Sequence, residues 1–258
     1  MLILWFALSA HAADACAPIG LGKALKAPAP AVFVLGERKG TQPDLARAER
    51  VVRRLARKAP VTLALQAVHR SQQPVLDGYA RGELAPSDLP GLLGWKGHWG
   101  FDFVPYQDLV TAAVDDVQVL AVGLDEQARP PEDAQVQVPP GYTHVLADAM
   151  GQHAMPAALA MDFASWMAWR DHAVASAALE GWSGEGYLVI LADRLHVEGG
   201  KGVSWQAERL TSAPVHTLLL ADDGACYPGD RYLADGLGTR AVDLARRTTR
   251  PDEPEAPR

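Results

Sequence analysis

Short apolar runs alternate along this chain with stretches of helical period. The runs are continuously apolar instead of alternating with polar residues, a pattern typical of strands buried on both faces of a parallel sheet. They cover residues 31–35, 61–65, 117–122, 187–191 and 215–220. Residues 44–57 have the period of a helix that joins the first two runs. The pattern predicts an α/β fold with a mostly parallel sheet and flanking helices.

The second and third runs are separated by about fifty residues, more than one crossover helix needs. We therefore expect a smaller helical subdomain, inserted after the second strand over residues 69–113. It carries a dense aromatic group: Trp95, Trp99, Phe101, Phe103 and Tyr106. These side chains either form the core of the insertion or line a pocket for a flat apolar ligand.

Further helical sequence covers residues 155–179, and we expect it to pack on the same side of the sheet as the insertion. Four prolines within residues 125–141 predict an irregular loop. Residues 30–240 are expected to form one domain, and the charged, proline-rich residues 248–258 are typical of a disordered tail.

The N-terminal residues 1–12 are apolar and end in small residues, which predicts a signal peptide and export to the periplasm or cell envelope. A basic region at its start is missing. Two cysteines, Cys16 and Cys226, are compatible with a disulfide in an oxidising compartment. Lipidation of Cys16 after cleavage is the alternative, and it would anchor the protein to a membrane.

Composition and charge argue against a nucleic-acid-binding function. The 258 residues are 48% hydrophobic and 21% charged, with a net charge of −7, which does not favour a nucleic-acid binder. The densest basic group has helical spacing and is interpreted as a solvated helix face: Arg50, Arg53, Arg54, Arg57 and Lys58. Phosphate-loop, Cys-X-X-Cys and Gly-X-Ser-X-Gly motifs are absent from the sequence.

The first apolar run ends in Gly36 and Glu37, which places a carboxyl group at the carboxyl end of a strand. Open α/β sheets keep their ligand crevice at that edge. A strand-end carboxylate also commonly caps the next helix or pairs with a nearby cation. Position alone therefore leaves a functional and a structural role open for Glu37.

Five sequence blocks in order resemble the ChaN-like haem-binding uptake proteins, relatives of the Tiki, TraB and erythromycin-esterase superfamily. The blocks are Leu35-Gly36-Glu37, residues 72–77 with Tyr79, Trp99-Gly100-Phe101 with Tyr106, residues 153–156 with Arg170-Asp171, and residues 192–197. The resemblance implies an α/β domain with a helical subdomain, export, often as a lipoprotein, and a connection to haem or iron. It also implies a homodimer by analogy, since some members hold haem between two subunits through a tyrosine. No tyrosine here is marked by a motif for that role.

The superfamily's site chemistry requires a Glu and a His on the first turn, a second Glu after the next strand, and a His on the late turn. Glu37 and His196 match, whereas Lys39 stands for the first His and Gln66 for the second Glu. A lysine repels a divalent ion and an amide has no basicity. We therefore expect no superfamily hydrolysis and a salt bridge between Lys39 and Glu37.

The remaining candidates each carry two interpretations. His196 is either a retained ligand or a hydrogen-bonded partner of Glu37. Arg170 reaches Glu37 or a haem propionate, or else forms an ion pair on or between helices. His153 faces the cleft or caps a helix, and His98 beside Trp99 is the candidate axial ligand.

Three functional hypotheses follow. The first is an exported binding protein for haem or another flat, iron-linked ligand, without a hydrolytic site, and its candidate ligand-binding residues are Glu37, His98, Trp99, Tyr106, His153, Arg170 and His196. The second is a metal-dependent hydrolase that uses Glu37, His153 and His196. The third is a non-catalytic scaffold of the cell envelope.

Overall fold

One parallel sheet organises the part of the chain that the structure describes. The computed structural model describes residues 17–234, apart from 114–116, 126, 151–155, 222–226 and 228. In these residues the strand order is β1-β7-β6-β2-β5-β3-β4, and all pairs are parallel. The strands are β1 (Ala17–Ile19), β2 (Ala31–Glu37), β3 (Val61–His69), β4 (Val117–Gly123), β5 (Tyr187–Asp193), β6 (Val215–Leu219) and β7 (Arg231–Leu233).

The five predicted apolar runs form β2 to β6, and the predicted α/β fold is confirmed. Every residue of β2 is buried, because helices cover both faces of the sheet. Along β2 the side chains alternate between two cores. Phe33 and Leu35 lie in one, and Val32 and Val34 lie in the other.

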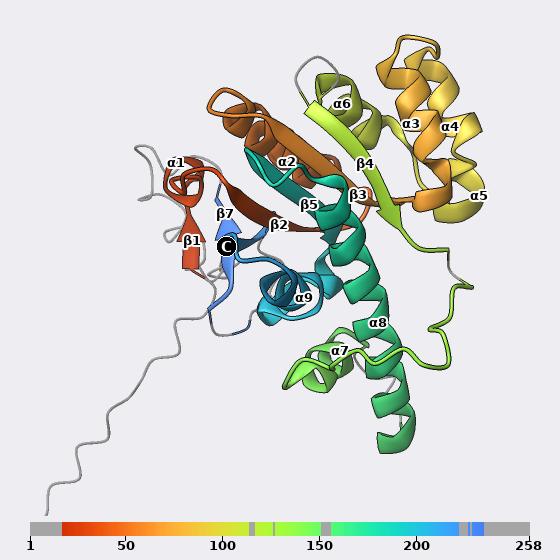
Figure 1. The fold of residues 1–258 in the computed structure, drawn as a ribbon, viewed down its shortest axis with the longest axis vertical. Helices are drawn as coiled ribbons and strands as arrows, with labels where there is room; N and C mark the ends of the chain where they lie inside the picture. The colour runs from red at the N-terminus through yellow and green to blue at the C-terminus, as the bar shows by residue number, and fades with distance from the viewer. Residues whose placement is uncertain are drawn as a thin grey trace, which may run out of the picture.

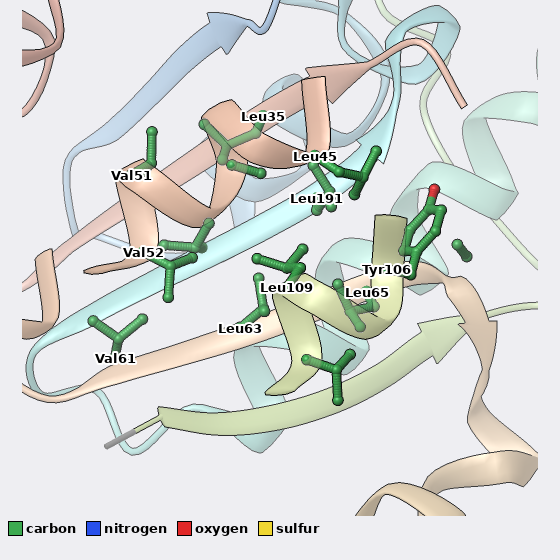
Figure 2. Packing of buried hydrophobic residues seen from close by; sticks show 14 of the residues in the cluster. Leu35, Leu45, Val51, Val52, Val61, Leu63, Leu65, Tyr106, Leu109 and Leu191 are labelled. Atoms are coloured by element: carbon green, nitrogen blue, oxygen red, sulfur yellow. The ribbon is translucent and has the colours of Figure 1, made fainter. Parts of the chain in front are cut away.

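Helix α2 (Gln42–Ala56) covers the first face of the sheet. Its apolar stripe includes Leu45, Val51 and Val52, and these side chains pack towards Leu35 of β2 (Figure 2). Leu109 joins the same core from the insertion. The helical pattern at residues 44–57 is thus confirmed, with the start of the helix two residues earlier.

The insertion between β3 and β4 is helical, as predicted, and packs on this first face. Figure 1 shows its first helices at the β4 end of the sheet. It comprises η1 (Arg70–Gln72), α3 (Gln73–Ala80), η2 (Pro86–Asp88), α4 (Leu89–Leu92), α5 (Trp95–Trp99) and α6 (Val104–Ala113).

The long helix α8 (Ala157–Gly181) packs on the second face, together with α9 (Gly202–Leu210). The expectation that it shares a side with the insertion is therefore wrong. Its C-terminal half packs on the side chains of Val32 and Val34, and its N-terminal half packs on α7 (Tyr142–Met150). Helical period identifies an apolar stripe but not the sheet face that the stripe covers.

The predicted loop is largely irregular, since residues 127–141 contain no helix or strand. Several short elements were not predicted: β1, β7, α1 (Leu21–Ala24), α7, α9, η3 (Arg194–His196) and η4 (Glu198–Gly200). Among the described residues, no helix is long and apolar enough to cross a membrane. The predictions for residues 1–12, Cys16, His153, Cys226 and residues 248–258 lie outside the described residues.

The carboxyl ends of the central strands meet at one edge. Glu37 of β2 lies beside Asp193 of β5 in register, and His69 of β3 lies beside Gly123 of β4. The β3–β4 register shifts between Leu65 and His69. A Cβ atom on Gly123 would lie 2.2 Å from the Gln66 carbonyl oxygen, so only glycine permits this close approach.

Candidate functional site

Glu37, at the carboxyl end of β2, is a buried acid with 1% of its surface exposed. The phenol of Tyr106, on α6 of the insertion, donates a hydrogen bond to its Oε1 atom. Its Oε2 atom is buried and has no hydrogen-bond partner among the described residues. Burial raises the pKa of the Glu37 carboxyl from its ordinary value of 4.5 to about 8, although the Tyr106 hydrogen bond lowers it in part. This side chain therefore holds a proton at neutral pH.

Lys39 does not form the predicted salt bridge with Glu37. Its Nζ atom lies 3.5 Å from Oδ2 of Asp193 and 4.2 Å from the centre of the Trp99 ring. Since Glu37 is protonated at neutral pH, Asp193 is the stronger partner for the lysine. Lys39 and Asp193 are both partly exposed, with 31% and 27% of their side-chain surfaces accessible.

Gln66 also contacts Asp193. Its Oε1 atom accepts a hydrogen bond of 2.8 Å from the Asp193 backbone N–H. The two positions that depart from the superfamily pattern, Lys39 and Gln66, therefore meet at the same residue of β5. Sequence reasoning did not select Asp193, although its place at a strand end is the signal that selected Glu37.

The aromatic residues of the insertion form a connected group above this edge. The ring of Trp95 lies 4.8 Å from those of Phe103 and Tyr106, and these three residues are buried. Trp99 and Phe101 are partly exposed, and the Trp99 indole N–H donates to the Ala67 carbonyl at 3.0 Å. The group is thus the core of the insertion, and two of its members, Trp99 and Phe101, reach the protein surface.

A groove of about 450 Å³, which we call the insertion groove, lies against this group at Trp95, Phe101 and Phe103, and Trp99 does not line it. Its lining residues are Pro90, Gly91, Trp95, Lys96, Gly100, Phe101, Asp102 and Phe103. Two apolar side chains in the same segments are unusually exposed, Leu92 at 51% and Val104 at 49%. The volume lies in the range of small-molecule sites.

His98 is exposed on α5, and its ring lies 4.7 Å from the ring of His69 in an edge-on arrangement. His69 is buried at the end of β3. His98 does not line the insertion groove, which receives Lys96 from the same helix. Sequence reasoning selected His98 but not His69.

His196 does not contact Glu37. Its Nδ1 atom lies 2.5 Å from Oδ1 of Asp171 on α8, and the Tyr142 phenol donates a 2.5 Å hydrogen bond to the other carboxylate oxygen. Asp171 is fully buried. Burial raises the pKa of Tyr142 well above its usual range. A carboxylate on Nδ1 orients the imidazole and presents its other nitrogen, Nε2, as a base or ligand.

Arg170 is turned towards the segment after β4. Its guanidinium donates to the carbonyl oxygens of Leu124 and Asp125 at 3.0 and 2.9 Å and lies 5.0 Å from the centre of the Trp166 ring. Glu37, whose hydrogen-bond partner is Tyr106, is not contacted by Arg170. The neighbouring Asp171, which sequence reasoning gave no separate role, carries the contact with His196 instead.

Of the predicted site residues, the structure thus brings Glu37 and Tyr106 into contact. Trp99 contacts Lys39, which lies close to Glu37 in sequence. His196 is paired separately, with Asp171. No three His, Cys, Asp or Glu side chains in the described ranges are arranged to hold a metal ion. His153, the third residue of the hydrolase hypothesis, lies outside those ranges.

Solved structures with similar folds include ChaN of Campylobacter jejuni, which was solved for its cofacial haem binding. It shares 15% sequence identity with this chain at a TM-score of 0.59, covering 75% of this chain and 82% of its own. At that identity the match concerns the fold alone. A search of curated proteins finds no match.

Two toxin structures match with TM-scores below 0.5. The C-terminal region of Pasteurella multocida toxin, described with a thiol-protease-like catalytic triad, has 11% identity and a TM-score of 0.46, covering 80% of this chain and 26% of its own. RRSP, a MARTX toxin effector domain from Vibrio vulnificus, has 14% identity and a TM-score of 0.44, covering 81% and 37%.

A family model described as haem-binding uptake, Tiki superfamily, ChaN matches residues 25–207. This range spans β2 to β5, the helical insertion and most of α9, and so contains both the Glu37 and the His196 sites. The chain belongs to this ChaN family of haem-binding uptake proteins.

Proposed function

We propose that this chain binds haem on the insertion groove. The observation that carries the proposal is the aromatic lining of the groove by Trp95, Phe101 and Phe103. Leu92 and Val104, which follow the lining residues Gly91 and Phe103 in sequence, are also exposed. Flat macrocycles stack on aromatic rings, and exposed apolar side chains of this size favour a surface that becomes covered. Family membership supports the same ligand.

The charge of the groove suits the ligand. Haem carries two propionate groups, and Lys96 in the groove offers a cation to one of them. The groove therefore supplies an apolar face and a positive edge. Asp102, which also lines it, disfavours a carboxylate on its own side and would orient the bound molecule.

For the iron ligand we propose His98, although it does not line the groove itself. Three phenols of the described chain, those of Tyr79, Tyr106 and Tyr142, belong to buried residues and are hydrogen-bonded to Thr111, Glu37 and Asp171. His98 is an exposed imidazole on α5, the helix that also supplies Trp95 and Lys96. A haem that extends from the groove across α5 would gain an axial nitrogen from this side chain.

The test is a titration of the purified protein with haemin, followed by the Soret band and by size-exclusion chromatography. Wild-type protein should give a saturable Soret shift, and dimer formation on loading would place haem between two copies. His98→Ala should alter the spectrum and weaken binding at least tenfold, and Phe101→Ala should weaken binding. His144→Ala, at an exposed histidine on α7, is the matched control. An unshifted wild-type spectrum, or variants identical to wild type, would overturn the proposal.

We also infer that the protein is exported and lacks superfamily hydrolysis. The apolar residues 1–12 and the two cysteines support export. Lys39 and Gln66, which both contact Asp193, support the loss of hydrolysis. Cell fractionation tests the location, and mass spectrometry of intact protein with and without reductant separates a lipid on Cys16 from a Cys16–Cys226 disulfide.

One observation favours a second candidate, a hydrolase with a histidine base. The Asp171–His196 pair resembles the oriented imidazoles that activate water. This candidate predicts cleavage of a p-nitrophenyl ester that is lost in His196→Ala and insensitive to a chelator. Activity that depends on added metal would instead restore the metal-dependent alternative with Glu37 and His153.

A further inference from the structure

Strand β7 diverges from β6 near the end of the sheet. The two strands share one register pair, Leu219 with Tyr232, whereas β6 pairs with β2 from Val215 to Leu219. Figure 1 shows β7 alongside β1, and those two strands pair over three residues. In the described part of the chain, one edge of β6 is therefore without a strand partner before Leu219.

The alternation of hydrogen-bonding directions along a strand identifies which backbone N–H and C=O groups of β6 face this open edge. The Pro214 carbonyl accepts from the Val32 N–H, and the Leu220 N–H donates to the Gly36 carbonyl, so these even-numbered residues point towards β2. In a parallel ladder the residues between them point the other way. Val215 and Thr217 thus present their N–H and C=O groups to the side from which β7 has diverged.

A cleft of about 690 Å³ lies along this edge. Its lining includes β6 from Val215 to Leu218, Ile19 at the end of β1, and Lys23 and Lys26 from the segment that follows β1. Neighbouring strands in a sheet are about 4.8 Å apart. A cleft that follows an open strand edge for four residues suits an extended backbone better than a compact ligand.

The cleft is cationic on a chain whose net charge is −7. Lys23, Lys26 and Arg231 line it and are exposed, and none of them forms an ion pair with another described residue. Asp230 also lines it but is buried, and its carboxylate accepts from the Gly199 N–H at 3.0 and 3.1 Å. Glu208 is the other acid of the lining.

We propose that the cleft binds an extended acidic segment of a partner protein, which adds as a strand to the open edge of β6. The backbone groups of Val215 and Thr217 supply the ladder hydrogen bonds, and the three cations select carboxylate side chains on the incoming strand. Strand addition of this kind gains affinity from the main chain and specificity from the flanking side chains. The site is separate from the insertion groove and does not depend on haem.

The test uses two capped hexapeptides in which valine alternates with glutamate or with lysine. Binding is followed by fluorescence anisotropy, and amide hydrogen exchange is followed at Val215 and Thr217. The glutamate peptide should bind saturably and slow exchange at both amides at least tenfold, and the lysine peptide should not. Saturable binding of both peptides, or of neither, would contradict the proposal.

Variants of this chain separate the contribution of the β6 backbone to peptide binding from that of the lysine charges. Lys23→Glu with Lys26→Glu should weaken the glutamate peptide at least tenfold, and Lys96→Glu, in the insertion groove, should leave its affinity unchanged. Thr217→Pro removes one N–H of the open edge and should abolish protection at Val215, with circular dichroism as the check on folding. If citrate or inorganic phosphate displaces the peptide at equal concentration, the cleft is a small-anion site and strand addition is wrong.

Discussion

The phenol of Tyr106 donates its hydrogen bond to Glu37, and this bond joins α6 of the insertion to the carboxyl end of β2. Both groups are buried. The strand-end carboxyl group that was selected from the sequence therefore also connects the insertion to the sheet. Changes at either residue should alter stability as well as any ligand binding.

Glu37 should make stability fall as pH rises. Its pKa is raised in the folded state, so between about pH 4.5 and about pH 8 the folded protein holds a proton that the unfolded chain has released. The stability that this group contributes is complete below the unfolded pKa of 4.5 and is lost as pH rises through the folded pKa of about 8. The slope of the free energy of unfolding for one such group is about 1.4 kcal/mol per pH unit. Glu37→Gln should flatten the pH dependence of the free energy of unfolding, measured by urea denaturation, by that amount, and an unchanged slope would show that Glu37 is ionised.

Tyr106→Phe should destabilise the protein by about 1–3 kcal/mol, because it leaves Oε1 of Glu37 buried without a donor. It should also raise the pKa of Glu37 further, since the hydrogen bond from Tyr106 lowers that pKa. Urea denaturation at acidic and alkaline pH measures both effects. Tyr79→Phe is the control, since it removes a 3.1 Å hydrogen bond between two hydroxyls and should cost about 1 kcal/mol or less.

Asp171→Ala should be strongly destabilising, by about 2–4 kcal/mol, because the carboxylate is fully buried and serves both Tyr142 and His196. Thermal and urea unfolding test this value. Asp148→Ala is the comparison: Asp148 contacts Tyr227 and His144 but is half exposed, and its loss should cost under about 1 kcal/mol. Equal losses for the two variants would mean that the buried pair gives no special support to α8.

Lys39→Ala should cost less than about 1 kcal/mol, since the ion pair with Asp193 is partly exposed. Lys39 lowers the pKa of Glu37 through its charge. Its removal should therefore move the upper end of the pH-dependent stability window to higher pH. A loss above about 2 kcal/mol, or a window that moves down, would point to a different partner for Lys39.

The strands of the central sheet could be predicted from sequence because each is a continuous apolar run. Strands β1 and β7 have three residues each and could not, since a run of that length has no readable period. The sequence predicted the helix α8, but not the face of the sheet on which it packs. That choice depends on which of the alternating side chains of β2 it covers.

Within the site, strand-end position identified Glu37, and aromatic density identified the insertion. The partners of both sites were missed because they are distant in sequence. His196 meets Asp171 across 25 positions and Glu37 meets Tyr106 across 69. Lys39 was assigned to Glu37 on proximity alone, whereas burial protonates Glu37 and leaves Asp193 as the charged neighbour.

Gln66 links the carboxyl ends of β3 and β5 without adding charge beside the end of β2. Its carboxamide oxygen accepts from the Asp193 backbone N–H, which a carboxylate at the same position would do equally well. The amide keeps that link between β3 and β5 but adds no further negative charge beside Asp193 and the buried Glu37. The link between the ends of β3 and β5 is therefore made by a neutral group, and the charge left at this edge, that of Asp193, is balanced by Lys39 alone among the described ion pairs.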